Sequence, residues 1–416
     1  MKVLLVSFLL DPQLGGGAST SAVRLARGLV QQGVEVVAVT THDKPEPHLT
    51  IEDGIKVYAF RPRNLYWIEN KDKQPLWKKV IWQSIDIWNP SAYRYLRRVI
   101  NAEKPDVIHI HKLRGLSPAV WSAAAAENCR PIIQTCRDYE LISPEGTLST
   151  RIGRLALQQH WSMRPYQALR RRMSNQVDVA TAPSRFTLET ITGVGFFSRA
   201  QKIVVPNTHG LTDSELAAIA IRTPQQLQST GGLKLLYLGR LEPEKGIEIL
   251  CRAFAGLADD LPYLSLDIAG SGTQETALRA SYTDMPRLCF HGHLAGVEKE
   301  NLIAQADVLV MPSTYQEIFG NSIIETYAYG KPVIASRIGG MPELVEEGIT
   351  GLLVEPNDVE SLQGAIRQLY ATPEAAVKMR SDCIRQARYY TIEAVTTAYL
   401  AAYETGMSAR PVLPRH

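Results

Sequence analysis

The chain has 416 residues, of which 45% are hydrophobic and 21% are charged, a composition typical of globular proteins. This length is too great for one ordinary core, so two domains are expected. The net charge of +3 gives no argument for nucleic acid as a partner. The five cysteines are an odd set without a Cys-x-x-Cys pair, which fits a reducing cytosol better than a disulfide framework.

The chain opens with an apolar run, residues 3–10, that predicts a buried first strand within residues 1–10. It is far shorter than the ~20 apolar residues of a membrane span, and a strand explains it better than a signal peptide. A glycine-rich loop, residues 14–20, should follow, then a helix capped by Ser19 or Thr20 and a second strand over residues 34–40. In open α/β sheets, a loop at the carboxyl end of a strand is where ligands bind.

The glycines of this loop do not form a dinucleotide-binding fingerprint. Thr20 stands where the third glycine belongs, and no acidic residue ends the second strand. A dinucleotide oxidoreductase is therefore disfavoured. Gly16 and Gly17 make either a tight turn or a place where the backbone approaches a phosphate or an acceptor.

Two segments combine basic and aromatic residues. Residues 61–104 contain four tryptophans among lysines and arginines, and residues 151–172 contain six arginines and no acid. One interpretation is solvated helices, with the tryptophans in a core. The other is a face for an anionic lipid-linked acceptor or for a membrane surface, formed by residues 61–100 and 151–172.

The strand predicted over residues 106–111 places His109 and His111 on one face. Two histidines could bind a metal ion, but no carboxylate or cysteine lies near them in sequence, so packing or a site wall is the better interpretation. The next predicted strand, residues 131–136, leads directly into Arg137 and Asp138.

A second series of strands begins at residue 233. Arg240 and Lys245 follow its first strand, and two cations around a strand-to-helix turn can clamp a diphosphate. The strand over residues 263–269 ends in a loop that contains Gly270 and Gly272.

Residues 311–329 hold the most informative pattern. An apolar strand ends at Met311, a loop carries Glu317, and a helix starting near Gly320 carries Glu325 about one turn inside it. Asn321, Ser322 and Glu325 share a helix face, and the amides at the helix start favour an anion. Carboxylates accept hydrogen bonds from hydroxyls, so the stretch suits a nucleotide sugar.

These motifs resemble those of the retaining glycosyltransferases of the GT-B fold, specifically glycosyltransferase family 4. The residues that carry the resemblance are Pro312-Ser313, Glu317, Phe319-Gly320 and Glu325, with Arg240, Lys245 and Gly246 and the His109-x-His111 segment. The resemblance implies catalytic roles for Arg240, Lys245, Glu317, Arg137 and Asp138. It implies donor binding by Gly16, Gly17, Gly270, Gly272, Phe319, Gly320, Asn321, Ser322 and Glu325, and an acceptor-side position for His109 and His111.

One position departs from the family pattern. Many members have His-Asp-Tyr where this chain has Arg137-Asp138-Tyr139. An arginine stays protonated and cannot act as a base, but it can stabilise negative charge on a phosphate or an acceptor.

The expected fold is α/β, with two doubly wound, parallel-sheet Rossmann-like domains facing across a cleft in the GT-B arrangement. The expected boundaries are residues 1–206 for the first domain, 207–232 for a linker and 233–385 for the nucleotide-sugar domain. Residues 386–406 should form a helix that packs back on the first domain, and residues 407–416 a tail.

The expected function is transfer of a sugar from a nucleoside-diphosphate sugar to a saccharide, lipid-linked or small-molecule acceptor. Surface polysaccharide, glycolipid or glycoconjugate assembly is the expected context, in the cytoplasm or at the inner face of the membrane. No cofactor or metal is expected, since Arg240 and Lys245 supply the positive charge and no Asp-x-Asp pair is evident. A catalytically silent sugar-nucleotide-binding subunit and an epimerase or hydrolase of the same fold are the alternatives.

Overall fold

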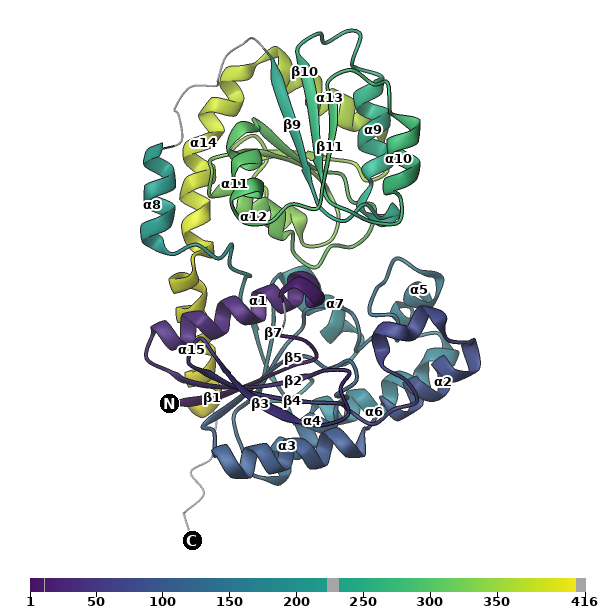
Figure 1. Ribbon diagram of the computed structural model, residues 1–416, viewed down its shortest axis with the longest axis vertical. Coiled ribbons are helices and arrows are strands. Elements are labelled where there is room, and N and C mark those ends of the chain that lie inside the picture. The colour runs from purple at the N-terminus through teal and green to yellow at the C-terminus, as the bar shows by residue number, and fades with distance from the viewer. Residues whose placement is uncertain (11, 223–231, 409–416) are drawn as a thin grey trace. The chain divides into compact units, whose positions relative to one another are not determined.

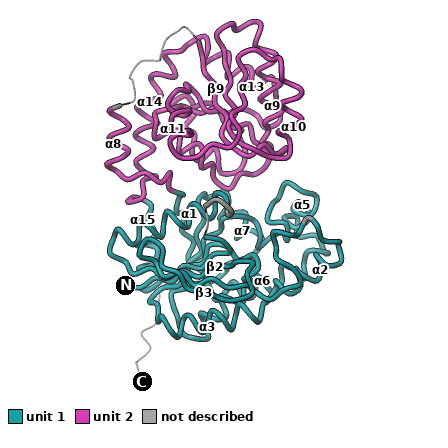
Figure 2. The backbone as a smooth tube through the Cα atoms, in the orientation of Figure 1, with its two compact units in different colours: residues 1–207, 395–416 teal, residues 208–394 magenta. Residues whose placement is uncertain are grey.

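The computed structural model describes residues 1–10, 12–222 and 232–408. The chain divides into two compact units: residues 1–207 and those from 395 onward form unit 1, and residues 208–394 form unit 2 (Figure 2). Within the predicted linker, the structure has a helix, α8 (Asp213–Arg222), which belongs to unit 2. Residues 223–231 of that linker and residues 409–416 of the predicted tail lie outside the described residues.

Unit 1 is built on an eight-stranded sheet with the order β3-β4-β2-β1-β5-β6-β7-β8. Its strands are β1 (Lys2–Ser7), β2 (Glu35–Thr41), β3 (His48–Glu52), β4 (Ile55–Phe60), β5 (Val107–Lys112), β6 (Ile132–Thr135), β7 (Val179–Ala182) and β8 (Gln201–Val204). Its helices are α1 (Pro12–Gln31), η1 (Ile68–Lys73), α2 (Leu76–Ile85), α3 (Pro90–Glu103), α4 (Ala119–Ala126), α5 (Arg151–Leu157), η2 (Trp161–Met163), α6 (Arg164–Ser174), α7 (Arg185–Gly193) and α15 (Ile392–Ser408).

Helices cover both faces of this sheet (Figure 1). Leu25 and Leu29 of α1 and Tyr399 and Tyr403 of α15 share one hydrophobic cluster with the apolar side chains of the central strands. Helices α3 and α4 lie against the opposite face (Figure 1). Strands buried on both faces explain the continuous apolar runs seen in the sequence.

The expectation that the first sheet is wholly parallel was wrong at one edge. Strand β3 pairs antiparallel with β4, while the other pairs in the sheet are parallel. Asp53 and Gly54 connect the two strands, both with positive φ (50° and 79°), which is the backbone that a tight two-residue hairpin turn requires.

The predicted glycine loop before the first helix was also wrong. Helix α1 begins at Pro12, and Gly16 (φ 62°, ψ −157°) interrupts it. Neither predicted cap residue caps the helix, because the Ser19 hydroxyl donates to the Leu9 carbonyl and the Thr20 hydroxyl to the Gly16 carbonyl.

Unit 2 contains a six-stranded parallel sheet with the order β11-β10-β9-β12-β13-β14, the strand order of a Rossmann fold. The expected pair of Rossmann-like α/β domains is thereby confirmed. The strands are β9 (Leu233–Leu238), β10 (Leu264–Ala269), β11 (Leu288–Gly292), β12 (Val308–Met311), β13 (Val333–Ser336) and β14 (Gly351–Val354). The helices besides α8 are η3 (Pro243–Lys245), α9 (Ile247–Ala255), α10 (Glu275–Ser281), α11 (Gly296–Gln305), α12 (Asn321–Tyr327), η4 (Met341–Glu343), α13 (Val359–Ala371), α14 (Pro373–Ala387) and η5 (Arg388–Tyr390).

Candidate functional site

Glu317 lies in the loop after β12, and its side chain is buried although it carries a charge. The ammonium of Lys245 lies 2.7 Å from Glu317 Oε1, and the Ser313 hydroxyl donates to the same oxygen at 2.7 Å. The Tyr315 hydroxyl donates to Oε2 at 2.6 Å. Both carboxylate oxygens are therefore hydrogen-bonded, which is the condition for burying a charge in a folded protein.

Lys245 reaches Glu317 because β9 and β12 are neighbours in the sheet, so that the loops after their carboxyl ends meet. The next residue, Gly246, has φ 70°, and a Cβ atom there would lie 1.9 Å from the Pro312 carbonyl oxygen. Only glycine allows the two loops to approach this closely. The Lys245 ammonium also donates to the Tyr315 hydroxyl at 3.0 Å.

Arg240, the second predicted cation, lies elsewhere in this loop. Its side chain is 66% exposed and its nearest carboxylate, that of Glu244, is 3.9 Å away. The structure thus brings Lys245 and Glu317 into contact and leaves the Arg240 guanidinium at the surface.

Gly270 and Gly272 have a packing role. A Cβ atom at Gly270 (φ 153°) would lie 1.8 Å from the Gly239 carbonyl oxygen, and one at Gly272 would lie 2.5 Å from that of Leu241. The amide of Leu241 donates to the Ser271 carbonyl at 2.9 Å, so the loops after β9 and β10 are joined by their backbones. These glycines therefore support the loop that carries Arg240.

The segment from Phe319 to Glu325 turns from loop into helix at Gly320 (φ 125°), and α12 has seven residues. The Phe319 ring is buried, edge-on to Tyr390 at 6.1 Å between ring centroids. The Ser322 hydroxyl donates to the Leu238 carbonyl at 2.9 Å, which ties the helix start, where Asn321 is the first residue, to the end of β9. Glu325 forms an ion pair with Lys299 of α11 at 2.8 Å.

In unit 1, His109 and His111 share one face of β5 as predicted, with ring centroids 4.0 Å apart. Both ring nitrogens of His109 have partners in the core, the Tyr403 hydroxyl and the Thr135 hydroxyl, each at 2.7 Å. Burial lowers the pKa of both histidines well below the usual value, so both rings are neutral near pH 7. Because both of its ring nitrogens have partners in the core, His109 is a core residue.

Arg137 donates from Nε to His111 Nδ1 at 3.0 Å and from Nη1 to the Asn207 side-chain oxygen. Because His111 Nδ1 accepts, its proton lies on Nε2, which is buried without a hydrogen-bond partner among the described residues. Burial lowers the pKa of Arg137. Asp138 instead accepts from the Glu140 amide at 2.8 Å and lies 3.6 Å from the Lys112 ammonium.

A second group of buried charges in unit 1 was missed by the sequence analysis. Arg170 is buried, pairs with Asp86 at 3.4 Å and donates to the Glu140 carbonyl at 3.2 Å. Burial raises the pKa of the Asp86 and Glu140 carboxyls to about 7 each. The prediction of a solvated basic helix over residues 151–172 was therefore wrong for Arg170, whose partners are far away in the sequence.

Comparison with known proteins assigns the family. Residues 16–208 match a glycosyl transferase 4-like domain, and residues 221–389 match the glycosyl transferases group 1 domain. A GDP-mannose-dependent alpha-(1-6)-phosphatidylinositol monomannoside mannosyltransferase of Mycolicibacterium smegmatis is 31% identical, over 70% of this chain and 78% of its own. The chain belongs to the group 1 glycosyl transferases.

Other relatives of this glycosyltransferase agree with that assignment. A glycogen synthase of Mycobacterium tuberculosis is 29% identical over 100% of this chain and 98% of its own. Among solved structures, HepE of Anabaena in complex with UDP and glucose has a TM-score of 0.67 at 20% identity, covering 99% of this chain and 100% of that one. That structural likeness confirms the GT-B fold.

The described part of this glycosyltransferase lacks both a membrane-spanning helix and a metal-binding cluster. None of the helices there is both long enough and apolar enough to cross a membrane. The same residues contain no group of three or more histidine, cysteine, aspartate and glutamate side chains placed to hold a metal ion.

Three further polar residues contact the predicted ones: Ser313, which was named from the sequence only as part of the motif, and Tyr315 and Lys299, which were not named. Ser313 and Tyr315 bind Glu317, and Lys299 pairs with Glu325. Ser313 and Tyr315 lie close to Glu317 in sequence, so proximity was the available signal. Lys299 precedes Glu325 by 26 residues and lies on a different helix, so no sequence signal indicated their contact.

Proposed function

We propose that this chain is a retaining glycosyltransferase that moves a sugar from a nucleoside-diphosphate sugar to an acceptor hydroxyl. The contact between Lys245 and Glu317 carries the proposal. It puts a cation suited to a diphosphate beside a carboxylate suited to sugar hydroxyls, at the carboxyl ends of β9 and β12. The retaining outcome is taken from the resemblance of the Glu317 and Glu325 motif.

The relatives support a nucleotide-sugar donor without deciding its base. The Mycolicibacterium relative is named as GDP-mannose-dependent, and HepE was solved with UDP and glucose. We therefore keep the donor as a nucleoside-diphosphate sugar and the acceptor as a saccharide, a lipid-linked or a small-molecule hydroxyl compound. The products would enter surface polysaccharide, glycolipid or glycoconjugate assembly.

In the proposed reaction the bond between the anomeric carbon and the diphosphate oxygen breaks, and a bond to the acceptor oxygen forms. The leaving diphosphate takes the acceptor proton. Lys245 and Arg240 neutralise the charge that develops on the diphosphate, without a metal ion, and Glu317 orients the sugar. Glu325 holds the ribose, which requires a change in its pairing with Lys299.

Arg137 has an electrostatic role in this proposal. Its guanidinium donates to two neutral groups, His111 and Asn207, so its positive charge is not cancelled by these contacts. This charge could pair with a phosphate of the donor or with the charge that develops on an acceptor. General-base catalysis by a side chain at this position is not part of the proposal, because arginine keeps its proton.

The deciding experiment is a thermal-shift panel of UDP-, GDP-, ADP- and dTDP-sugars on the wild type and on Arg240→Ala with Lys245→Ala. A stabilising shift from one base family that the double variant loses is the expected result. No shift from any nucleotide sugar would overturn the donor site. Once a donor is known, release of free sugar without an acceptor would identify a hydrolase or epimerase, and binding without turnover a silent subunit.

We also propose peripheral contact with an anionic membrane at the cytoplasmic face, through residues 61–100 and 151–172. Helix α2 exposes an apolar stripe formed by Leu76, Trp77, Val80 and Ile81. Lys78 and Lys79 flank the stripe, and the Lys78 ammonium lies 5.6 Å from the Trp77 ring.

Trp161 of the second segment is 73% exposed. Apolar side chains bordered by lysines are the pattern of interfacial helices.

Not all of the tryptophans belong to this surface. Trp82 is buried and its indole N–H donates to the Tyr66 carbonyl at 3.0 Å. It forms a small cluster with Phe8, Leu9 and Ile68. Residues 61–104 therefore combine a tryptophan in the core with an exposed stripe on α2.

A further inference from the structure

Unit 1 contains a groove of about 800 Å³ that none of the residues predicted as catalytic, donor-binding or acceptor-side lines. It runs over the sheet between α1 and the edge strands β4 and β3, and all of its lining residues fall between Leu9 and Glu69. The cause is the β3–β4 hairpin, since a two-residue turn joins these strands where a crossover helix would otherwise cover the sheet. In α/β folds such a helix normally buries this surface.

The floor of the groove is formed by small, uncharged side chains. Ala38 of β2 and Val57 and Ala59 of β4 point into it, and Val23 and Ala26 of α1 form one wall. The volume falls in the upper part of the range of about 300–1,000 Å³ typical of small-molecule sites. The groove can therefore hold more than one sugar ring.

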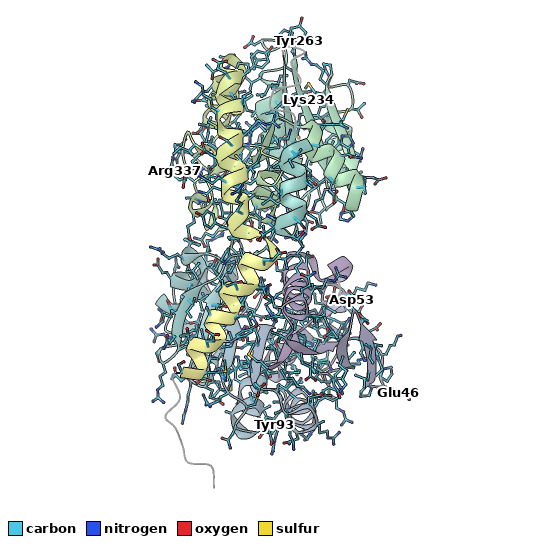
Figure 3. All side chains as sticks on the ribbon, turned by 90° about the vertical axis from the view of Figure 1, so that its left-hand side faces the viewer. Glu46, Asp53, Tyr93, Lys234, Tyr263 and Arg337 are labelled. Carbon is cyan, nitrogen blue, oxygen red and sulfur yellow. The ribbon has the colours of Figure 1, made fainter. Side chains whose placement is uncertain are left out.

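The rim carries more negative than positive charge. Four carboxylates line the groove, those of Asp43, Glu52, Asp53 and Glu69. Arg27 is the cation among the lining residues, and it is paired with Asp53 at 2.9 Å (Asp53 is labelled in Figure 3). Phosphate and acidic sugars would be repelled here. The rim is suited to a neutral ligand that donates hydrogen bonds.

An aromatic ring completes the lining. Trp67 is half-buried beside Phe8, with ring centroids 5.5 Å apart, and borders the groove together with His42 and His48. Thr50 on β3 adds a hydroxyl, which donates to Glu52 at 3.1 Å. A saccharide matches this set, because its C–H faces pack on aromatic and small apolar side chains while its hydroxyls donate to carboxylates.

We propose that this groove binds a neutral saccharide chain, as the part of the acceptor that precedes the reacting hydroxyl. The assignment to the acceptor depends on the proposed function, whereas the binding of the saccharide does not. A lipid surface does not fit, because the rim carries carboxylates, and an amphipathic helix of another protein is an outcome that the test would reveal.

The test is saturation-transfer NMR and calorimetry of the full chain with maltoheptaose, cellohexaose and mannohexaose. Thr50→Trp should fill the groove and weaken binding at least tenfold. Ile51→Trp is the matched control, since Ile51 is the next residue on the same strand, faces the opposite side and is 73% exposed. A thermal-unfolding comparison of the two variants checks that both fold.

Two results would overturn the proposal: no binding of any of these neutral oligosaccharides, or equal binding by the Thr50→Trp and Ile51→Trp variants. Lys245→Ala separates this proposal from the donor proposal. That variant should keep saccharide binding and lose the nucleotide-sugar shift, whereas Thr50→Trp should do the reverse. Saccharide binding without any nucleotide-sugar shift would contradict the proposed donor site and support the saccharide groove.

Discussion

The Lys245 ammonium and the Glu317 carboxylate form an ion pair at 2.7 Å. The proposed function assigns Lys245 to the diphosphate of the donor and Glu317 to its sugar. A donor must therefore draw Lys245 toward the diphosphate while Glu317 keeps its bonds from Ser313 and Tyr315.

Lys245→Met should abolish the nucleotide-sugar shift and lower kcat/KM by about 10²-fold, since it removes one charge that stabilises the leaving group. Stability should fall by about 2–3 kcal/mol, because Glu317 is left buried without its counter-ion. Thermal unfolding and steady-state kinetics measure the two effects. Lys234→Met is the matched control, an exposed lysine at the start of β9 (labelled in Figure 3). An unchanged kcat/KM in Lys245→Met would contradict the assignment.

Tyr315→Phe tests the hydroxyl that joins Lys245 and Glu317. The ring, whose centroid lies 4.8 Å from the Lys245 ammonium, is kept, and the hydrogen bonds at 3.0 and 2.6 Å are lost. Loss of about 1 kcal/mol of hydrogen bonding predicts a roughly fivefold higher KM for the donor, with a smaller change in kcat. A residue that only supports the fold would instead lower the melting temperature and leave KM as in the wild type.

Gly246→Ala should destabilise unit 2 by about 1–3 kcal/mol, because its Cβ atom would meet the Pro312 carbonyl at 1.9 Å in a left-handed backbone. The two loops must separate, so donor binding should weaken in parallel. Gly364→Ala is the control, since a Cβ atom there meets nothing within 4 Å and the site lies within helix α13. Equal melting temperatures for the two variants would argue against a tight approach of the loops.

The sequence indicated that Lys245 and Glu317 each follow a strand of a parallel sheet, but the strand order that makes those two strands neighbours comes from the structure. Their direct contact depends on the loop conformations, which no local pattern encodes. The β3–β4 hairpin was predictable from Asp53-Gly54 between two alternating runs, a recognised turn signal. The Arg170–Asp86 pair was not, because it joins residues 84 positions apart through tertiary packing.

The contribution of the Glu140 carboxyl to the stability of unit 1 should be lost as the pH rises from about 5 to 8. Burial raises the pKa of Glu140 to about 7 from 4.5, so in this window the folded state holds a proton that the unfolded chain has released. The stabilisation is complete below pH 4.5 and is lost as the pH rises through 7. Glu140→Gln should remove this contribution, so that its stability relative to the wild type rises with pH, while the bond from the Leu113 amide is kept. Urea unfolding across this pH range measures the free energy of unfolding. The same change with pH in the wild type and in Glu140→Gln would contradict the prediction.

Membrane contact is best tested on α2, because neutralising Arg170 would break a buried ion pair and unfold unit 1. Trp77→Ser with Val80→Ser should release the protein from phosphatidylglycerol vesicles in cosedimentation, as two apolar anchors are lost. Tyr263→Ser is the control: Tyr263 belongs to unit 2, is labelled in Figure 3 and is 64% exposed, close to the 60% of Trp77.

The electrostatic contribution of the lysines distinguishes binding to an anionic membrane from nonspecific hydrophobic adsorption. Each lysine near an anionic surface contributes about 1 kcal/mol, so Lys78→Gln with Lys79→Gln should weaken vesicle binding about 30-fold. The loss should disappear on phosphatidylcholine vesicles and shrink as salt is raised, since screening removes the attraction. Binding that is equally strong on both lipids and indifferent to the two lysines would instead assign the α2 stripe to contact with another protein.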